Sequence, residues 1–182
     1  MSACSKCVLR CGASRVVAGA GNPDAKIMFI GEAPGKKEDE LGIPFVGSAG
    51  KFLDEMLSTI KLNRSDIYIA NVCKCRPPGN RDPRPEEIDE CWPWLEKQII
   101  IIDAAVIVTL GKHSLNRFVP NAKISESHGK LFEINLPQIG MRKIFALYHP
   151  AAALYNGSMR KILIEDFKKI PKILNNKIKK EQ

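Results

Sequence analysis

The sequence contains no hydrophobic run long enough to cross a membrane. The longest apolar run, Ile99 to Val108, includes Asp103, whereas a spanning helix needs about 20 apolar residues. The first residues, Met1-Ser2-Ala3-Cys4, also lack the apolar core of a signal peptide. We therefore expect a soluble, cytoplasmic protein that does not associate with membranes.

Domain linkers and internal repeats are absent as well. No stretch of the 182 residues is rich enough in proline, glycine or serine to separate two domains. Apolar residues make up 45% of the chain, which is enough for a full hydrophobic core. The sequence thus predicts one domain over residues 1–182, which includes an N-terminal cysteine-bearing loop, residues 1–14.

Acidic residues are too few to balance the basic ones, and the net charge is +8. The excess favours an anionic partner such as nucleic acid. Part of it is local, because residues 160–182 contain eight basic and three acidic side chains. This segment is either a solvated C-terminal helix with a lysine tail or a surface that faces DNA.

Strand and helix patterns alternate along the chain. The segments rich in β-branched and aromatic residues are Lys26–Ile30, Ile67–Val72, Ala104–Leu110 and Lys143–Leu147, with Lys130–Ile134 as a further edge strand. The helical patterns are Gly50–Ile60 with Ser48 as N-cap, Pro85–Ile99, Gly111–Phe118, and Ser158–Ile178 with an interruption near Pro171. This alternation predicts a three-layer α/β/α sandwich with a central, mainly parallel four-stranded sheet.

The glycine-rich segment 31–50 follows the first predicted strand. Open α/β sheets place their ligand sites at the carboxyl ends of their strands, so we expect the functional site here. The segment has neither the Gly-Lys-Ser/Thr ending nor the GxGxxG spacing of phosphate-binding loops, which argues against a nucleotide hydrolase.

Six cysteines in an intracellular protein suggest a metal site more than disulfides. Cys4 and Cys7 have the spacing of a ligand pair, and Cys75 and Cys91 could complete a site with four thiolates. The spacing allows either zinc or an iron–sulfur cluster and by itself slightly favours zinc. We expect the two remaining cysteines, Cys11 and Cys73, to be small buried apolar residues.

Several motifs in a fixed order resemble the family 4 uracil-DNA glycosylases, the iron–sulfur-containing branch of archaea and bacteria. The resemblance covers nearly the whole chain. The motifs are Cys4-x-x-Cys7, Gly31-Glu32-Ala33-Pro34-Gly35, the segment 42–50, Asn71-Val72-x-Lys74-Cys75-Arg76-Pro77-Pro78, Gly79-Asn80-Arg81-x-Pro83, Cys91, and His149-Pro150 with the following Ala151-Ala152-Ala153-Leu154.

The resemblance implies a [4Fe-4S] cluster held by Cys4, Cys7, Cys75 and Cys91, in place of zinc. It also implies an enzyme of base excision repair that flips uracil out of DNA and hydrolyses its N-glycosidic bond. In such an enzyme the base must leave the stack before its sugar can be reached. Tyr155 and Asn156 depart from the pattern, because a basic residue is common there.

Recognition of uracil needs an amide and an aromatic face. Asn71 can donate to uracil O4 and accept from N3–H, groups that cytosine reverses, although an asparagine at a strand end can equally form a turn. Phe45 could stack on the flipped ring, where an aromatic face contributes about 1–3 kcal/mol, or could be an ordinary core residue. Gly31 and Ala33 would complete the substrate-binding loop.

Catalysis needs a donor for uracil O2 and a group that holds the attacking water. By resemblance His149 is the donor, with a strand-capping role as the alternative. Glu32 would position the water, because Ala33 stands where related families often have Asp or Asn; it could instead stabilise its loop. Glu38 could lie near uracil C5 and exclude the methyl group of thymine.

Contacts to DNA are expected from Arg76 and Arg81 in a proline-rich loop, unless these are simply solvated charges. Leu154 could fill the gap that the flipped base leaves, as apolar wedges do, or it could be buried. We expect a prokaryotic, nucleoid-associated monomer that acts on single- and double-stranded DNA; whether a sliding clamp recruits it stays open. A non-catalytic nucleic-acid-binding module with a thiolate metal site is the main alternative.

Overall fold

The computed structural model describes residues 1 and 4–175. In this part of the chain, one six-stranded sheet has the order β1-β3-β2-β4-β6-β5. The strands are β1 (Ala20–Gly21), β2 (Ile27–Gly31), β3 (Tyr68–Asn71), β4 (Val106–Leu110), β5 (Leu131–Leu136) and β6 (Gly140–Leu147).

The four central strands, β3, β2, β4 and β6, are parallel, and these are the four strands that the sequence predicts. The sheet itself has six strands and not four, because an antiparallel strand is added at each edge. The expected edge strand near Lys130–Ile134 is β5, which pairs with β6. The other, β1, has only two residues, and no β pattern of that length can be recognised in a sequence.

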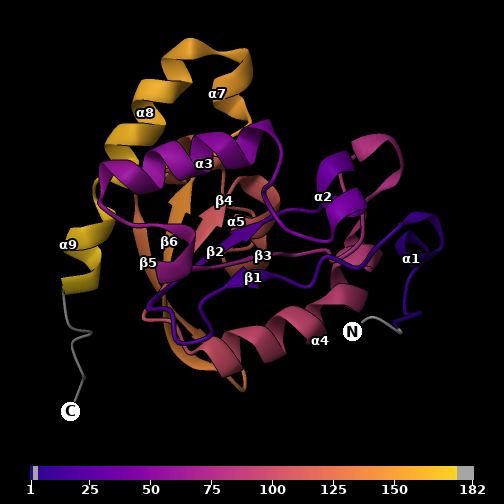
Figure 1. The fold of residues 1–182 in the computed structure, drawn as a ribbon. Helices are drawn as coiled ribbons and strands as arrows, with labels where there is room; N and C mark the ends of the chain where they lie inside the picture. The colour runs from indigo at the N-terminus through magenta and orange to yellow at the C-terminus, as the bar shows by residue number, and fades with distance from the viewer. Residues whose placement is uncertain (2–3, 176–182) are drawn as a thin grey trace.

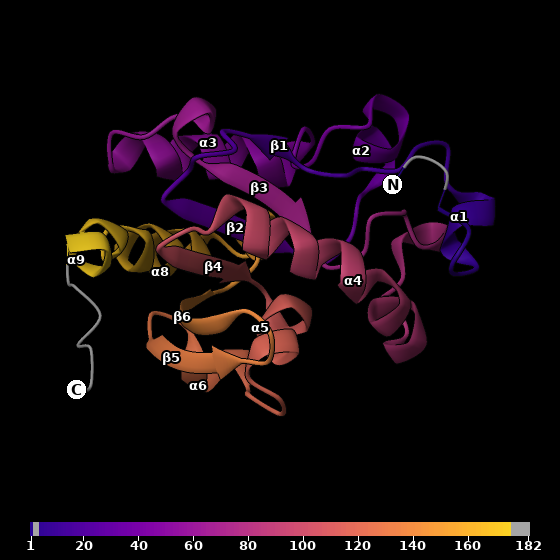
Figure 2. The ribbon, with the colours of Figure 1, turned by 90° about the horizontal axis from the view of Figure 1, so that it is seen from below.

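Helices cover both faces of the sheet, which confirms the three-layer α/β/α sandwich. In Figure 1, α3 and α8 lie above the sheet and α4 lies below it; Figure 2 shows α4 across the lower face. The α-helices are α1 (Leu9–Gly12), α2 (Lys36–Leu41), α3 (Ser48–Thr59), α4 (Pro85–Ile102), α5 (Lys112–Phe118), α6 (Ile124–Ser127), α7 (Ala152–Tyr155), α8 (Gly157–Phe167) and α9 (Ile170–Asn175), and the short 3₁₀ turns are η1 (Arg64–Asp66) and η2 (Pro78–Asn80).

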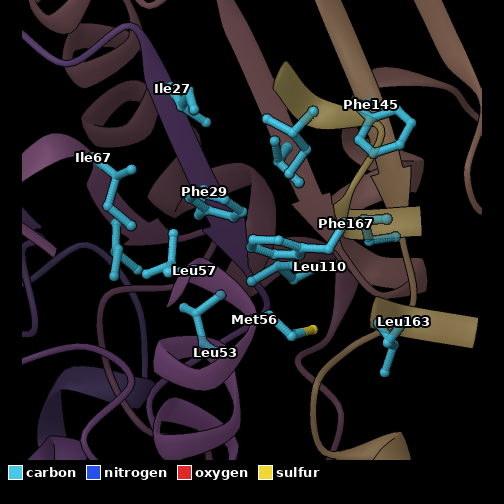
Figure 3. Packing of buried hydrophobic residues seen from close by; sticks show 14 of the residues in the cluster. Ile27, Phe29, Leu53, Met56, Leu57, Ile67, Leu110, Phe145, Leu163 and Phe167 are labelled. Carbon is cyan, nitrogen blue, oxygen red and sulfur yellow. The ribbon is translucent and has the colours of Figure 1, made fainter. Parts of the chain in front are cut away.

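Alternate side chains of the central strands supply two separate cores. Phe29 of β2 packs on the α3–α8 side, where its ring stacks on Phe167 with centroids 5.5 Å apart (Figure 3). Its neighbours Met28 and Ile30 point to the other side and pack against α4. Because both faces are buried, β2 is apolar throughout, as parallel strands are.

One predicted helix cap differs from the structure, and one predicted helix break agrees with it. The N-cap of α3 is Gly47 and not Ser48, because the Gly47 carbonyl already accepts the N–H of Lys51 at 3.0 Å. The predicted break near Pro171 is confirmed: α8 ends at Phe167, and Pro171 is the second residue of α9, where its missing N–H is tolerated. Residues 176–178 of the predicted helix lie outside the described residues.

The last helix lies far from the loops at the carboxyl ends of the strands. In Figures 1 and 2, α9 and α2 are at opposite ends of the molecule. Among residues 1 and 4–175, no helix combines the length and apolar composition that crossing a bilayer requires.

Candidate active site

A cavity of about 370 Å³ opens at the carboxyl ends of the parallel strands. This is the size of small-molecule sites in general. The segments that follow β2, β3 and β6 all contribute to its wall, because parallel strands end at the same edge of a sheet. Its lining includes seven predicted site residues: Glu32, Ala33, Glu38, Phe45, Asn71, Arg81 and His149.

Asn71 ends β3, and its side chain is 2% exposed. Among the described residues, its buried Oδ1 atom has no hydrogen-bond partner. Buried amide oxygens are nearly always paired, so this atom can accept a hydrogen bond from a ligand or a water in the cavity. Gly31 lies beside Asn71 in the sheet, and a Cβ there would overlap Oδ1 and lie 2.7 Å from the Phe45 ring. Gly31 therefore lets the amide and the ring approach each other.

Phe45 has a left-handed backbone, with φ of +54°. The guanidinium of Arg64 holds this turn: it donates to the carbonyls of Phe45 and of Pro44, the latter at 3.2 Å, and is bound by Asp54 at 2.6 Å. The ring of Phe45 lies 5.6 Å from that of His149, with 31° between the planes. Phe45 thus forms a fixed aromatic wall of the cavity. The role of Arg64 in holding it was not predicted from the sequence.

His149 follows β6 and is a neutral donor. Its Nδ1 accepts the backbone N–H of Ala151 at 3.1 Å, so in the neutral ring the proton is on Nε2. Burial lowers the pKa of His149 to about 4, which keeps the ring neutral near pH 7. The side chain can therefore donate one hydrogen bond into the cavity without carrying a charge.

Glu38 lines the cavity and also fixes the loop that carries Phe45. Its Oε1 accepts the backbone N–H groups of Val46 and Gly47 at 2.9 and 2.8 Å. The carboxylate therefore joins α2 to the start of α3, a contact that sequence reasoning missed. Its proposed place near C5 of a pyrimidine stays a prediction.

Glu32 lines the cavity and lies within a cluster of ionisable groups. Its Oε2 is 3.7 Å from Nε2 of His113, which is 2.9 Å from Oδ2 of Asp82. Lys112 is 3.2 Å from the same Asp82 oxygen. Burial raises the pKa of Glu32, and the positive charge of His113 opposes the rise. His113 and Asp82 were not predicted, although His113 follows a predicted strand at this same edge.

Of the residues expected to contact DNA, Arg81 lines the cavity, and Arg76 and Leu154 are the chain neighbours of the lining residues Pro77 and Tyr155. The Arg76 guanidinium donates to Asn80 at 2.7 Å, and Arg81 donates to both carboxylate oxygens of the buried Glu87, at 2.8 and 2.6 Å. Leu154 is 47% exposed on α7 and is therefore not the buried leucine that the alternative required. The neighbouring Tyr155 is 91% exposed and lines the cavity.

The four predicted ligand cysteines line a second cavity, where α1 and its preceding loop meet the start of α4. Cys4, Cys7, Cys75 and Cys91 all contribute to it. The Trp94 indole N–H points to the Cys4 sulfur at 3.3 Å, and the Lys74 backbone N–H to the Cys91 sulfur at 3.2 Å. Four thiolates supported by N–H donors suit a metal or an iron–sulfur cluster, so the residues present fit such a group.

The remaining two cysteines differ from each other. Cys73 is fully buried, and burial raises the pKa of its thiol, as expected of an apolar core residue. Cys11 is exposed, so the prediction of a buried Cys11 is wrong. Residue 11 lies on the outer side of α1, whereas Leu9 of the same short helix faces the core.

Comparison with known proteins identifies the class of this fold and cavity. The profile of the Uracil DNA glycosylase superfamily matches residues 18–174, so the chain belongs to this superfamily. Its curated relatives include type-4 uracil-DNA glycosylases from three organisms. That of Archaeoglobus fulgidus is 46% identical over 96% of this chain and 89% of its own. Those of Sulfurisphaera tokodaii and Thermotoga maritima are 48% and 44% identical, over 92% and 91% of this chain and 78% and 86% of theirs. The predicted family 4 resemblance is thereby confirmed.

Proposed function

We propose that this protein is a DNA repair glycosylase that flips uracil out of DNA, hydrolyses its N-glycosidic bond and leaves an abasic site. Membership of the superfamily and 44–48% identity to type-4 uracil-DNA glycosylases support the reaction. The observation that carries the assignment to this cavity is that Asn71 and His149 both line it, the first with a buried Oδ1 that has no partner among the described residues and the second with a neutral ring.

Asn71 reads the base in this proposal. Its Oδ1 accepts N3–H of uracil and its amide N–H donates to O4. Cytosine presents a donor and an acceptor in the reverse places, so a fixed amide would leave both groups mismatched. Each mismatched buried group costs about 1–3 kcal/mol. Phe45 stacks on the ring, and Glu38 leaves no room for a methyl group at C5.

His149 and Glu32 act on the bond that breaks. When the bond between C1′ and N1 breaks, its electron pair stays on uracil, and negative charge develops on O2. The Nε2–H of His149 donates to that oxygen without transferring its proton. Glu32 holds a water whose oxygen adds to the positively charged C1′, and it accepts the proton that the water loses. Ala33 lines the cavity beside Glu32, and Gly31 leaves room for the Asn71 amide and the Phe45 ring.

We also propose that Cys4, Cys7, Cys75 and Cys91 hold a [4Fe-4S] cluster. The identity to type-4 uracil-DNA glycosylases supports a cluster in place of zinc. All four cysteines line one cavity, and two of their sulfur atoms face N–H donors, which suits the thiolates of an iron–sulfur site. When bound, the group joins the N-terminal segment to α4 and takes no part in the hydrolysis.

The DNA partners follow from the residues around the cavity. Leu154 enters the gap left by the flipped base, and Arg76 and Arg81 face the phosphates, in single- and double-stranded DNA. The protein then acts as a monomer in the prokaryotic cytoplasm, in association with the nucleoid. Recruitment by a sliding clamp has no support from any residue described above.

The test uses oligonucleotides with a single uracil, as single strands and as duplexes, followed by alkaline cleavage of abasic sites. We expect strand scission with uracil and none with thymine at the same position. Asn71→Asp should weaken the discrimination between uracil and cytosine, because a carboxylate cannot donate to O4. No scission of any uracil substrate would contradict the proposal and favour the DNA-binding module. Absorption near 400 nm together with bound iron separates the cluster from zinc.

A further inference from the structure

Three ionisable side chains form a chain beside the active-site cavity. Nε2 of His113 lies 2.9 Å from Oδ2 of Asp82 and 3.7 Å from Oε2 of Glu32. The imidazole is therefore placed between two carboxylates, one of which lines the cavity. The proposed reaction gives a role to Glu32 alone, so His113 and Asp82 have no assigned purpose.

The three residues come from separate segments, so the chain exists only in the folded protein. Glu32 follows β2, Asp82 follows η2, and His113 is the second residue of α5. Gly111 turns the chain between β4 and α5 with φ of +93°, and its N–H donates to the carbonyl of Leu147 at 2.8 Å. This hydrogen bond joins the segment that carries His113 to the end of β6, close to His149.

The orientation of the His113 ring is determined by Asp82. Since Nε2 is the ring atom that approaches Asp82 at hydrogen-bond distance, Nε2 carries a proton and donates it to that carboxylate. The His113 side chain is only 18% exposed, whereas Asp82 is 65% exposed. Asp82 thus closes the chain from the solvent side, and its own pKa is lowered by its hydrogen bonds to His113 and Lys112.

The charges around Glu32 oppose one another. Burial raises the pKa of its carboxyl group, and so does the negative charge of Asp82. His113 and Lys112, both on α5, lower it, and His113 has the larger effect. A carboxylate that must hold and deprotonate water has to be ionised. Of the groups that face Glu32, His113 does most to keep it so.

We propose that His113 is a positioning residue that keeps the Glu32 carboxylate ionised and directed into the cavity, while Asp82 orients its imidazole. This inference rests on the proposed role of Glu32. In this arrangement Glu32 binds the water, His113 positions the Glu32 carboxylate, and Asp82 orients the His113 ring.

The test measures single-turnover excision of uracil against pH for the unmodified protein and five variants. His113→Leu should reduce the rate by about 10- to 100-fold, as loss of a supporting partner typically does. It should also move the acidic limb of the pH profile to higher pH, because Glu32 loses the cation that favours its ionised form. His113→Gln retains an N–H donor, so its excision rate should lie between those of His113→Leu and the wild type. Its acidic limb should stay at the higher pH, because glutamine cannot carry the positive charge.

Glu32→Gln and the double variant Glu32→Gln/His113→Leu test two claims separately: that Glu32 acts on the water, and that His113 acts through Glu32. If His113 acts through Glu32, the double variant should be no slower than Glu32→Gln alone. A wild-type rate in Glu32→Gln would refute the proposed role of Glu32. A slow Glu32→Gln together with a wild-type rate and limb in His113→Leu would refute the positioning role alone. Additive losses in the double variant would refute it too.

His128 offers a matched control. Its Nδ1 lies 2.6 Å from Oδ2 of Asp166, so it is also a histidine paired with an aspartate, but it lies outside the cavity lining. His128→Gln should lower the melting temperature without changing the excision rate or its pH limb. If the acidic limb of the pH profile moved as far in His128→Gln as in His113→Leu, the shift would be a general effect of losing a His–Asp pair. That result would overturn the proposal.

Discussion

The two cavities of this protein are built in opposite ways. The active-site cavity stands on the ends of parallel strands, and hydrogen bonds within the protein hold its walls: Arg64 fixes Phe45, Glu38 fixes the loop after it, and Ala151 fixes His149. The cysteine cavity joins the N-terminal segment to residues 75 and 91 without any shared strand. Hydrogen bonds within the protein therefore shape the first cavity, whereas the second lies between segments that are far apart in the sequence.

The variants below separate these two modes of construction. Changes in the active-site cavity should reduce the rate with little effect on stability, and changes in the cysteine cavity should do the reverse.

The largest effect is expected for His149→Ala. It removes the only neutral imidazole donor among the described residues that line the cavity, and loss of one such donor typically costs about 2.7–4 kcal/mol of transition-state stabilisation, or roughly 100- to 1,000-fold in rate. Single-turnover excision measures the loss, and binding of a uracil oligonucleotide should change little. An unaltered rate would remove the role of His149 at O2.

Gly31→Ala should reduce excision by about 100-fold, since a displacement near 1 Å in a catalytic site has that cost. The new methyl group would overlap Oδ1 of Asn71 and push the Phe45 ring away. Gly157→Ala is the matched control, because a Cβ at Gly157 meets nothing within 4 Å. Equal excision rates for the two variants would show that the close approach of the Asn71 amide and the Phe45 ring to Gly31 does not matter for catalysis.

Cys75→Ser should abolish absorption near 400 nm and lower the melting temperature by about 5–10 °C, the shift that a loss of a few kcal/mol gives in a chain of this size. Excision at low temperature should stay within about tenfold of the wild type, because the active-site walls do not need the cysteines. Cys11→Ser, at an exposed cysteine outside the cavity, should change none of these quantities. If Cys75→Ser stayed folded and lost excision completely, the two cavities would not be independent.

The smallest effect concerns pH. Burial lowers the pKa of His149 from 6.5 to about 4, so the folded state binds fewer protons than the unfolded state between these values. His149 should therefore lower the stability as the pH falls from about 6.5 towards 4. The melting temperature at pH 7 and pH 4.5 measures this, and the drop should be smaller in His149→Gln. An imidazole NMR titration with a midpoint near 6.5 would contradict the burial effect.

Much of the fold could be read from local patterns. The apolar run of β2 and the spacing of the next three parallel strands predict the central sheet, because burial on both faces requires such runs. The edge strand β1 could not be predicted, since two residues, one of them glycine, are too few to show the alternation of apolar and polar side chains that marks a strand. Ser48 was the expected N-cap on composition, but the hydrogen bond from Lys51 to Gly47 places the helix start one residue earlier.

Local sequence patterns were enough to place Asn71 at the end of a strand and His149 after one, to give Cys4 and Cys7 the spacing of a ligand pair, and to match the motifs to family 4 uracil-DNA glycosylases. These facts depend on order along the chain. No local pattern indicated that Arg64 would hold Phe45, that Asp82 and His113 would reach Glu32, or that Cys11 would face the solvent. Such contacts join residues from separate segments, and their distances are fixed by how the helices and loops pack on the sheet, which no local pattern records.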